Sequence, residues 1–297
     1  MNEAGNELLS RTSWLYTKLV EGPFFFFDLW SLAHLYSGFF VMLVVLALRA
    51  RRPWAWLVAA LVAYELVELA FIYVAFHAFH PETLKDQVTD VVVGSLGALV
   101  ATQLVRRCAA TPGPGRARTT RHAAAALMAV AIAFEWVGNY GYHYSRPLFN
   151  SPGLCWWAFF LWTLGFIAIG EGYALFEARL ASRLKALAVT VLGYGAVLGV
   201  VEYLGYAVLE IREVGHPERT ALALDLVHGT RALHAFYLAA PWAGVAAFVG
   251  LRGLLRRATV AGCAGGVAGA RADAAEKGGA RRGTAVDRRV ERRILTP

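Results

Sequence analysis

The sequence has few charged residues and very little cysteine. Asp, Glu, Lys and Arg make up only 17% of the 297 residues, whereas hydrophobic residues make up 58%, which is too apolar for an ordinary soluble domain. The three cysteines, Cys108, Cys155 and Cys263, show no paired spacing, so neither a disulfide framework nor a cysteine zinc site is expected. This composition indicates a membrane protein.

The hydrophobic residues are concentrated in runs long enough to cross a bilayer, about 20 residues each. Lipid offers no hydrogen-bond partners to the backbone, and the runs are too long and too uniformly apolar for barrel strands. Helices are therefore the expected spanning elements. The sequence predicts an all-α polytopic membrane protein with about seven transmembrane helices, at 29–48, 54–77, 88–105, 122–138, 155–176, 186–209 and 230–251.

The net charge of +8 is carried mainly by alternate loops. Basic residues follow the first, third, fifth and seventh predicted spans and are sparse in the loops between. The positive-inside rule then places the N-terminus outside and the C-terminus in the cytoplasm. This pattern favours the inner (cytoplasmic) membrane of a bacterium, with membrane lipids and not nucleic acid as the partner. The residues are Arg49, Arg51, Arg52, Arg106, Arg107, Arg116, Arg118, Arg121, Arg179, Arg183, Lys185, Arg252, Arg256 and Arg257.

Five segments are expected along the chain. They are an N-terminal extracytoplasmic segment (1–28), a three-helix unit (29–105), a cytoplasmic linker (106–121), a four-helix unit (122–257) and a disordered basic cytoplasmic tail (258–297). The tail is rich in Ala, Gly and Arg and has too few large apolar residues to form a core.

Two similar stretches suggest an internal repeat. "HPETLKDQVTDVVVG" begins at His80 and "HPERTALALDLVHG" begins at His216. Glu65 precedes the first stretch at nearly the distance at which Glu202 precedes the second. The four-helix unit is therefore expected to contain a repeat of the first unit, with Asp90 equivalent to Asp225.

Ionisable side chains cluster at the outer ends of the predicted spans. Each costs roughly 2.5–3.5 kcal/mol to insert into a membrane, so such a cluster is a hypothesis for a site. On one helix face, Asp86 and Asp90 are followed by Gly94, Gly97 and Ala101, small residues that let helices approach closely. The candidates in the first half are His34, Glu65, Glu68, Asp86 and Asp90.

The second half carries a looser set of candidates around an aromatic loop. Tyr140, Tyr142 and Tyr144, with nearby tryptophans, are typical of an interfacial aromatic belt. The stripe that Asp225 begins is expected to continue through Gly229 on the next helix. The candidate site residues are Glu135, Glu202, Asp225 and His228.

Three interpretations of these groups remain open. Carboxylates and imidazole together can hold a divalent cation, with His34, Glu65, Glu68 and Asp90 as the candidate ligands. Crowded carboxylates can also supply a general acid beside a general base. Alternatively, the same residues only tie helices together and cap their outer ends.

Part of the first half resembles a known family. "DLWSLAHLYSGFF", which starts at Asp28, the pair Glu65 and Glu68, and "DVVVGSLGALVA", which starts at Asp90, are similar to the VanZ-like bacterial integral membrane proteins. The resemblance covers roughly residues 24–105. Gly94 stands where the family has Asn, Ala101 where it has a second Gly, and Glu68 where Gln is common. The resemblance implies a connection with the cell envelope and glycopeptide-antibiotic resistance.

The sequence therefore predicts an inner-membrane protein whose outward-facing acid and histidine pocket binds a cation or an envelope-related, lipid-linked ligand. One alternative is a membrane-embedded enzyme that performs acid–base chemistry on a lipid or isoprenoid. A second alternative is an ion-coupled transporter, which would need acids on a path to the cytoplasm, where Glu171 lies.

The predicted orientation can be tested by cysteine labelling. In a background without native cysteines, single cysteines at Glu82, Asn150 and Glu218 should react in intact cells with an impermeant thiol reagent. Cysteines at Arg52 and Arg116 should react only after permeabilisation, because the positive-inside rule places them in the cytoplasm. Labelling of the cysteine at Arg52 or Arg116 in intact cells would show that the predicted orientation is wrong.

Overall fold

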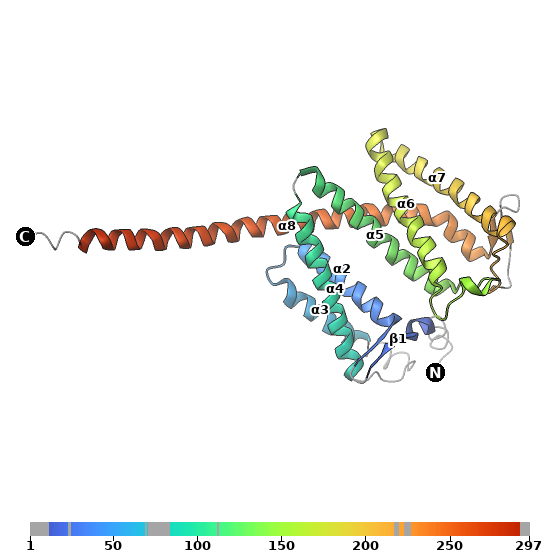
Figure 1. Cartoon of the computed structure of the whole chain (residues 1–297), viewed down its shortest axis with the longest axis horizontal. Helices are drawn as coiled ribbons and strands as arrows, with labels where there is room; N and C mark the ends of the chain where they lie inside the picture. The colour runs from blue at the N-terminus through green and yellow to red at the C-terminus, as the bar shows by residue number, and fades with distance from the viewer. Residues whose placement is uncertain are drawn as a thin grey trace, which may run out of the picture.

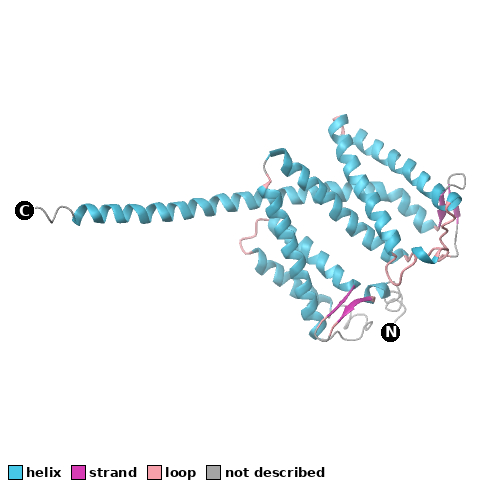
Figure 2. Ribbon diagram, in the orientation of Figure 1, coloured by secondary structure: helices cyan, strands magenta, loops and turns pink. Residues whose placement is uncertain are grey.

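The computed structural model describes residues 12–22, 25–68, 70, 84–111, 113–216, 220–222 and 227–291, and it is predominantly helical (Figure 2). Its described part contains seven α-helices, two short two-stranded sheets and short 3-10 and π-helical turns. The helices are α2 (Leu29–Ala47), α3 (Pro53–Glu68), α4 (Leu84–Ala110), α5 (Gly113–Tyr140), α6 (Trp156–Leu180), α7 (Arg183–Tyr203) and α8 (Arg231–Glu291).

Six of these helices are long and apolar enough to cross a membrane. The exception is α3, whose 16 residues span roughly 24 Å at 1.5 Å per residue, short of the roughly 30 Å hydrocarbon core. The second predicted span extended to residue 77, but residues 71–83 lie outside the described part of the chain. The structure thus confirms an all-α membrane-type protein with six such helices, and a seventh span stays a prediction.

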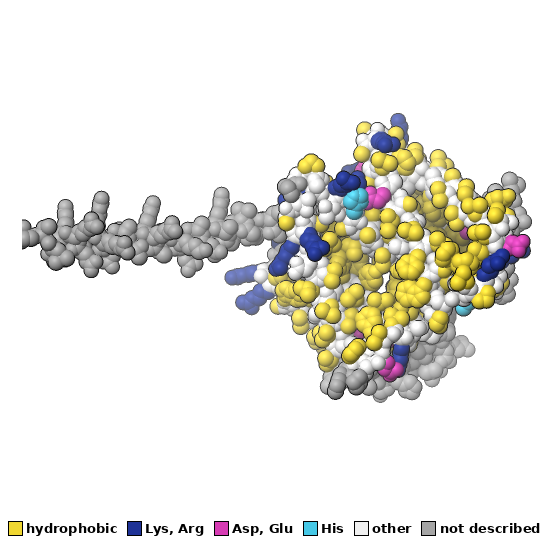
Figure 3. Space-filling view, in the orientation of Figure 1, with side chains coloured by type: hydrophobic (Ala, Val, Ile, Leu, Met, Phe, Trp, Pro, Cys, Tyr) yellow, Lys and Arg dark blue, Asp and Glu magenta, His cyan; other side chains and the backbone are white. Residues whose placement is uncertain are grey.

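The helices form one bundle, which α8 crosses (Figure 1). Helix α8 packs against α2, α4, α5, α6 and α7. The chain reverses between consecutive helices, so the turns after α2 and α6 lie toward one end of the bundle and the aromatic loop after α5 lies toward the other. Lys and Arg side chains gather mainly toward the first of these ends, and hydrophobic side chains cover much of the visible face (Figure 3). We call the first the basic end.

The described backbone of α8 stays helical to Glu291 and projects beyond the bundle (Figure 1). The segment from Ala258 onward is rich in Ala and Arg, which favour a helix, and in Gly, which disfavours it. The expectation of a disordered tail from Ala258 to Pro297 stays a prediction. Residues 292–297 lie outside the described part.

The closest helix packing in the bundle joins α2 to α4 through glycines. A Cβ atom on Gly38 would overlap the carbonyl oxygen of Gly94, and a Cβ atom on Gly97 would overlap the carbonyl oxygen of Leu35. Only glycine permits this approach of two backbones, which dispersion forces stabilise where no hydrophobic effect drives helices together. The face predicted from Asp90 through Ala101 is thus the face that packs on α2.

Helix α3 adds to this pair through one narrow stripe. Leu57, Leu61 and Glu65, spaced four residues apart, are buried, whereas Trp56, Val58 and most other α3 side chains are exposed. A Cβ atom on Gly94 would meet the Leu61 side chain at 3.0 Å. The α3 stripe therefore lies on α4 beside the glycine contact.

The start of α2 is fixed by a hairpin and a cap. Strands β1 (Lys18–Glu21) and β2 (Phe26–Asp28) pair antiparallel and lead directly into the helix. The Asp28 carboxylate accepts hydrogen bonds from the Ser31 backbone N–H at 2.8 Å and from its hydroxyl at 2.9 Å. Such caps typically stabilise a helix by about 1 kcal/mol. Asp28 is therefore the N-cap of α2.

The glycine contact generates a stability prediction. Gly97→Ala should destabilise the protein by about 1–3 kcal/mol, the usual effect of inserting a methyl group into a packed contact. The matched control is Gly195→Ala on α7, where an added Cβ atom has nothing within 4 Å and alanine improves helix propensity. Thermal melting in one detergent compares them, and equal midpoints for Gly97→Ala and wild type would contradict the packing.

Candidate functional site

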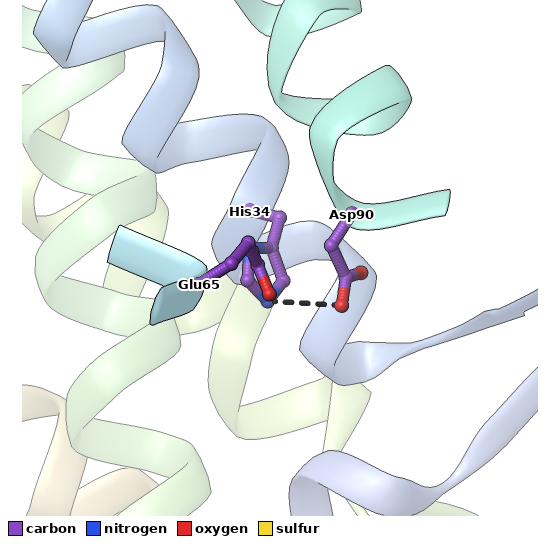
Figure 4. A group of neighbouring side chains, drawn as sticks. All are labelled: His34, Glu65 and Asp90. Atoms are coloured by element: carbon purple, nitrogen blue, oxygen red, sulfur yellow. Dashed lines mark ion pairs between the residues drawn. The ribbon is translucent and has the colours of Figure 1, made fainter. Parts of the chain in front are cut away.

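Three of the predicted candidates come together in the structure. His34 on α2, Glu65 on α3 and Asp90 on α4 converge from three helices (Figure 4). We call them the His34 cluster. Their exposed fractions are only 3%, 8% and 6%, so all three polar side chains are buried. One potential ligand atom from each lies within 4.8 Å of the others.

The imidazole of His34 faces a carboxylate with each ring nitrogen. Nδ1 lies 3.8 Å from Glu65 Oε1, and Nε2 lies 3.5 Å from Asp90 Oδ2. Both separations exceed the 2.7–2.9 Å typical of a charge-assisted hydrogen bond. Nε2 is buried and makes no hydrogen bond to any residue that the structure describes. The cluster therefore has a buried ring nitrogen that makes no hydrogen bond to a described residue and that lies beside two carboxylates.

The helix packing explains why these side chains meet. His34 lies four residues before Gly38, and Asp90 lies four residues before Gly94, so each is one turn from the glycine contact on the same helix face. Glu65 lies four residues after Leu61, and α3 runs in the opposite direction. All three are thus displaced by one turn from the glycine contact, toward the end of the bundle away from the basic end.

Aromatic rings enclose the imidazole. The ring centroids of Trp30 and Tyr64 lie 5.7 Å and 5.9 Å from that of His34, both edge-on. Asp28, on the same motif, is occupied as the N-cap of α2 and does not join the cluster. The cluster is therefore a small polar group within apolar and aromatic surroundings, where electrostatic interactions are stronger than in water.

Several other predicted candidates are not described in the same detail. Glu68 is the last residue of α3 and Asp86 lies in the first turn of α4, but their side chains lie outside the described part. Asp225 lies wholly outside it. His228 is on β4 (Val227–Gly229), and its side chain is not described.

The second stripe does not match the prediction, and Glu135 as a site residue stays a prediction. Strand β4 pairs with β3 (Thr220–Leu222), and α8 begins only at Arg231, so Gly229 is in a hairpin and not on the expected helix face. The proposed repeat of the first unit stays a prediction. Glu135 is exposed on α5 and accepts a hydrogen bond from the Asn139 side chain of its own helix at 3.3 Å.

Glu202 belongs to a separate cavity. Its Oε1 accepts a 2.6 Å hydrogen bond from the Tyr237 hydroxyl of α8, and its Oε2 is buried without a hydrogen bond to any described residue. It lines a cavity of about 310 Å³ between α6 and α7, which we call the α6–α7 slot. Its walls include Leu161, Trp162, Gly165 and Ile169 of α6, Gly193, Tyr194, Val197 and Glu202 of α7, Tyr237, and Tyr142 from the aromatic loop.

The aromatic loop is partly buried, contrary to the predicted interfacial belt. Tyr140 and Tyr142 are 8% and 6% exposed. The Tyr142 oxygen accepts hydrogen bonds from the indole N–H groups of Trp136 and Trp162, both at 2.9 Å. Desolvation by burial raises the pKa of the Tyr142 phenol well above its usual range. Tyr142 therefore stays protonated, and neither indole bond uses its proton.

These tyrosines were missed as site residues because their partners are distant in sequence. Tyr140 contacts Glu213 and Thr230 through its hydroxyl, at 3.2 Å and 3.0 Å. The alternation of Tyr140, Tyr142 and Tyr144 was the available signal, since it continues aromatic side chains from the end of α5 into the following loop. The alternation does not distinguish a buried network from a surface belt.

At the basic end, acids are paired with arginines between helices. Glu171 of α6 binds Arg121 at 2.9 Å and His122 of α5. Glu177 binds Arg252 of α8 at 2.9 Å. An ion-coupled transporter would need acids on a path toward the cytoplasm. Among the described residues, Glu171 and Glu177 at the basic end are instead paired with basic side chains of neighbouring helices.

Comparison with models of protein families, with curated proteins and with solved structures finds no match to this chain. The VanZ-like resemblance therefore stays a prediction, and the geometry of the two sites carries the functional argument.

Proposed function

We propose that the protein is an integral membrane protein that binds one divalent first-row transition-metal ion, such as Zn²⁺, through His34, Glu65 and Asp90. The observation that carries this proposal is the buried Nε2 atom of His34, which has no hydrogen bond to a described residue and lies beside two buried carboxylates. A metal ion gives that nitrogen a partner and holds the three helices together.

The separations support a bound ion better than direct pairing. Two ligand atoms that are each 2.0–2.1 Å from a tetrahedral Zn²⁺ lie about 3.4 Å apart. Nε2 and Asp90 Oδ2 are 3.5 Å apart, close to that spacing. The ligand atoms of all three residues lie within 4.8 Å of one another, so side-chain rotations must bring the remaining separations to that spacing.

Charge balance also supports a divalent ion. Two ionised carboxylates and a neutral imidazole carry a charge of −2, and a protonated imidazole would leave −1. A divalent cation neutralises the two carboxylates and leaves the imidazole neutral, the form that coordinates metals.

The donor set indicates the kind of metal. Imidazole nitrogen suits Zn²⁺ and other first-row transition metals, whereas Mg²⁺ and Ca²⁺ prefer oxygen ligands. Three protein ligands leave at least one coordination position open, as in catalytic zinc sites. An external ligand or a water molecule can occupy that position, so metal binding is compatible with either an envelope-ligand receptor or an acid–base enzyme.

The predicted orientation places this site at the extracytoplasmic side of a bacterial cytoplasmic membrane. The cluster lies near the starts of α2 and α4, and the arginines that the positive-inside rule assigns to the cytoplasm lie at the other end. The ion would therefore reach the site from outside the cell, which agrees with a role at the cell envelope.

The proposal predicts one bound Zn²⁺ per chain. Protein treated with chelator and then titrated with Zn²⁺ by calorimetry should bind one equivalent and melt at a higher temperature, because an ion that binds only the folded state stabilises it. Asp90→Asn should weaken binding by at least about 100-fold, since loss of an outer-shell partner alone costs 10–100-fold. Mg²⁺ should bind more weakly than Zn²⁺.

The matched control is Asp28→Asn. Asp28 is a buried carboxylate at the start of the same helix, and asparagine is an equally good N-cap, so this variant should bind Zn²⁺ like wild type. Equal losses of Zn²⁺ affinity in Asp28→Asn and Asp90→Asn would mean that replacing any buried acid disturbs the fold, and that Asp90 is not a specific ligand. If wild-type protein binds no Zn²⁺ and chelator leaves its melting unchanged, the cluster is a helix-to-helix tie and the proposal is wrong.

A further inference from the structure

The α6–α7 slot is an apolar cavity whose lining includes buried polar atoms without a hydrogen bond to any described residue. Its volume of about 310 Å³ lies at the lower end of the range for ligand pockets. Leu161 of α6 and Val197 and Val201 of α7 line the slot and also belong to the exposed hydrophobic surface, at 43%, 65% and 50% exposure. The slot therefore opens through a membrane-facing surface.

The shape of the slot favours a single extended chain. Along α7 its lining runs from Thr190 to Glu202, roughly 18 Å at 1.5 Å per residue. Glycines keep it open, because added Cβ atoms on Gly165 and Gly193 would have nothing within 4 Å. A long, narrow and mostly apolar cavity of this volume suits one lipid chain better than the two chains of a phospholipid.

Two hydrogen-bonding groups on the α7 wall lack partners. Glu202 Oε2 and the Tyr194 hydroxyl are buried and make no hydrogen bond to any described residue. Tyr194 and Glu202 lie on one helix face but roughly 12 Å apart along the axis at 1.5 Å per residue, so Tyr194 faces the chain region of the slot and Glu202 its headgroup region. Tyr142 also lines the slot, with its proton unused by the indole bonds. The slot thus offers a carboxyl oxygen that accepts hydrogen bonds and phenols that donate them.

The charges of the lining select the headgroup. Among the described residues, the slot is lined by no Lys or Arg, so a phosphate or carboxylate headgroup would find no cation and would be repelled by Glu202 if it is ionised. A quaternary ammonium would satisfy the carboxylate but not the phenol protons. A hydroxyl group both donates to a carboxyl oxygen and accepts from a phenol.

We propose that the α6–α7 slot binds an uncharged, single-chain lipid alcohol, with its hydroxyl beside Glu202 and its chain along α6 and α7 toward Phe176. This site is independent of the His34 cluster, since none of its lining residues belongs to α2, α3 or α4. Binding here neither requires nor supplies a metal ion.

The test uses the full chain in phosphatidylcholine vesicles and a hexadecanol probe with a photoreactive diazirine in its chain. Labelling should saturate and should fall on peptides of α6 and α7. Unlabelled hexadecanol should compete about tenfold better than hexadecanoate, hexadecyltrimethylammonium or 2-heptadecanone, because only the alcohol matches both the acceptor and the donors.

Two glycine variants provide a matched pair. Gly193→Leu fills the slot and should reduce labelling about tenfold. Gly195→Leu lies on the same helix, where an added Cβ atom also meets nothing within 4 Å, but Gly195 does not line the slot, so labelling should stay at the wild-type level. Gly165→Leu repeats the test from α6. Equal labelling of Gly193→Leu and wild type would overturn the proposal.

Glu202→Gln tests the headgroup assignment, because it should change which competitor the slot prefers. The glutamine carbonyl can still accept from Tyr237, but its N–H₂ replaces the free oxygen and donates instead of accepting. This variant should therefore favour the ketone over the alcohol as competitor. An unchanged preference, or wild-type protein that prefers the acid, the ammonium or the ketone, would refute binding of an alcohol. Removal of metal by chelator should leave all of these results unchanged.

Discussion

The close approach of α2 and α4 at Gly38, Gly94 and Gly97 is the constraint on which the first site depends. Because a Cβ atom at Gly38 or Gly97 would overlap a backbone carbonyl oxygen of the other helix, the register of the two helices is fixed at these glycines. One turn away, the same register sets His34 opposite Asp90. Leu61, which lies on Gly94, then brings Glu65 to the same level from α3.

Burial gives this arrangement its chemical consequence. The three side chains of the His34 cluster leave water together, and their imidazole is the basic group that lies between the two carboxylates. At 3.5 Å and 3.8 Å these contacts are too long for strong hydrogen bonds. The helices cannot simply move closer to shorten them, because their backbones already touch at the glycines. The proposed ion would bridge the side chains at these separations without any helix movement.

The sequence was sufficient to predict what depends on local spacing. The four-residue steps from Asp90 through Gly94 to Ala101, and the acid at Glu65, predicted the faces that meet. The sequence could not predict which acids would lie close together in the fold. Asp28 is the N-cap of α2, and Glu202 accepts a hydrogen bond from Tyr237, which is 35 residues away on another helix. The stripe from Asp225 through Gly229 was mispredicted for another reason. The last span was expected from residue 230 and α8 begins at Arg231, but the residues just before it pair as strands β3 and β4, which motif similarity alone did not indicate.

Glycine has one effect between α2 and α4, where it permits close packing, and another between α6 and α7, where it lines a cavity. This difference distinguishes the two sites. Gly38 and Gly97 face another backbone, so α2 and α4 pack closely there, and the His34 cluster lies one turn away. Gly165 and Gly193 face no atom within 4 Å of an added Cβ, so between α6 and α7 the same residue type leaves a cavity. Small residues in a membrane helix thus permit close packing, but a helix closes on its neighbour only where the opposing face is also small. Leu161, Trp162 and Ile169 of α6 line the slot together with Gly193, so large side chains on α6 accompany the glycine where the slot stays open to an apolar chain.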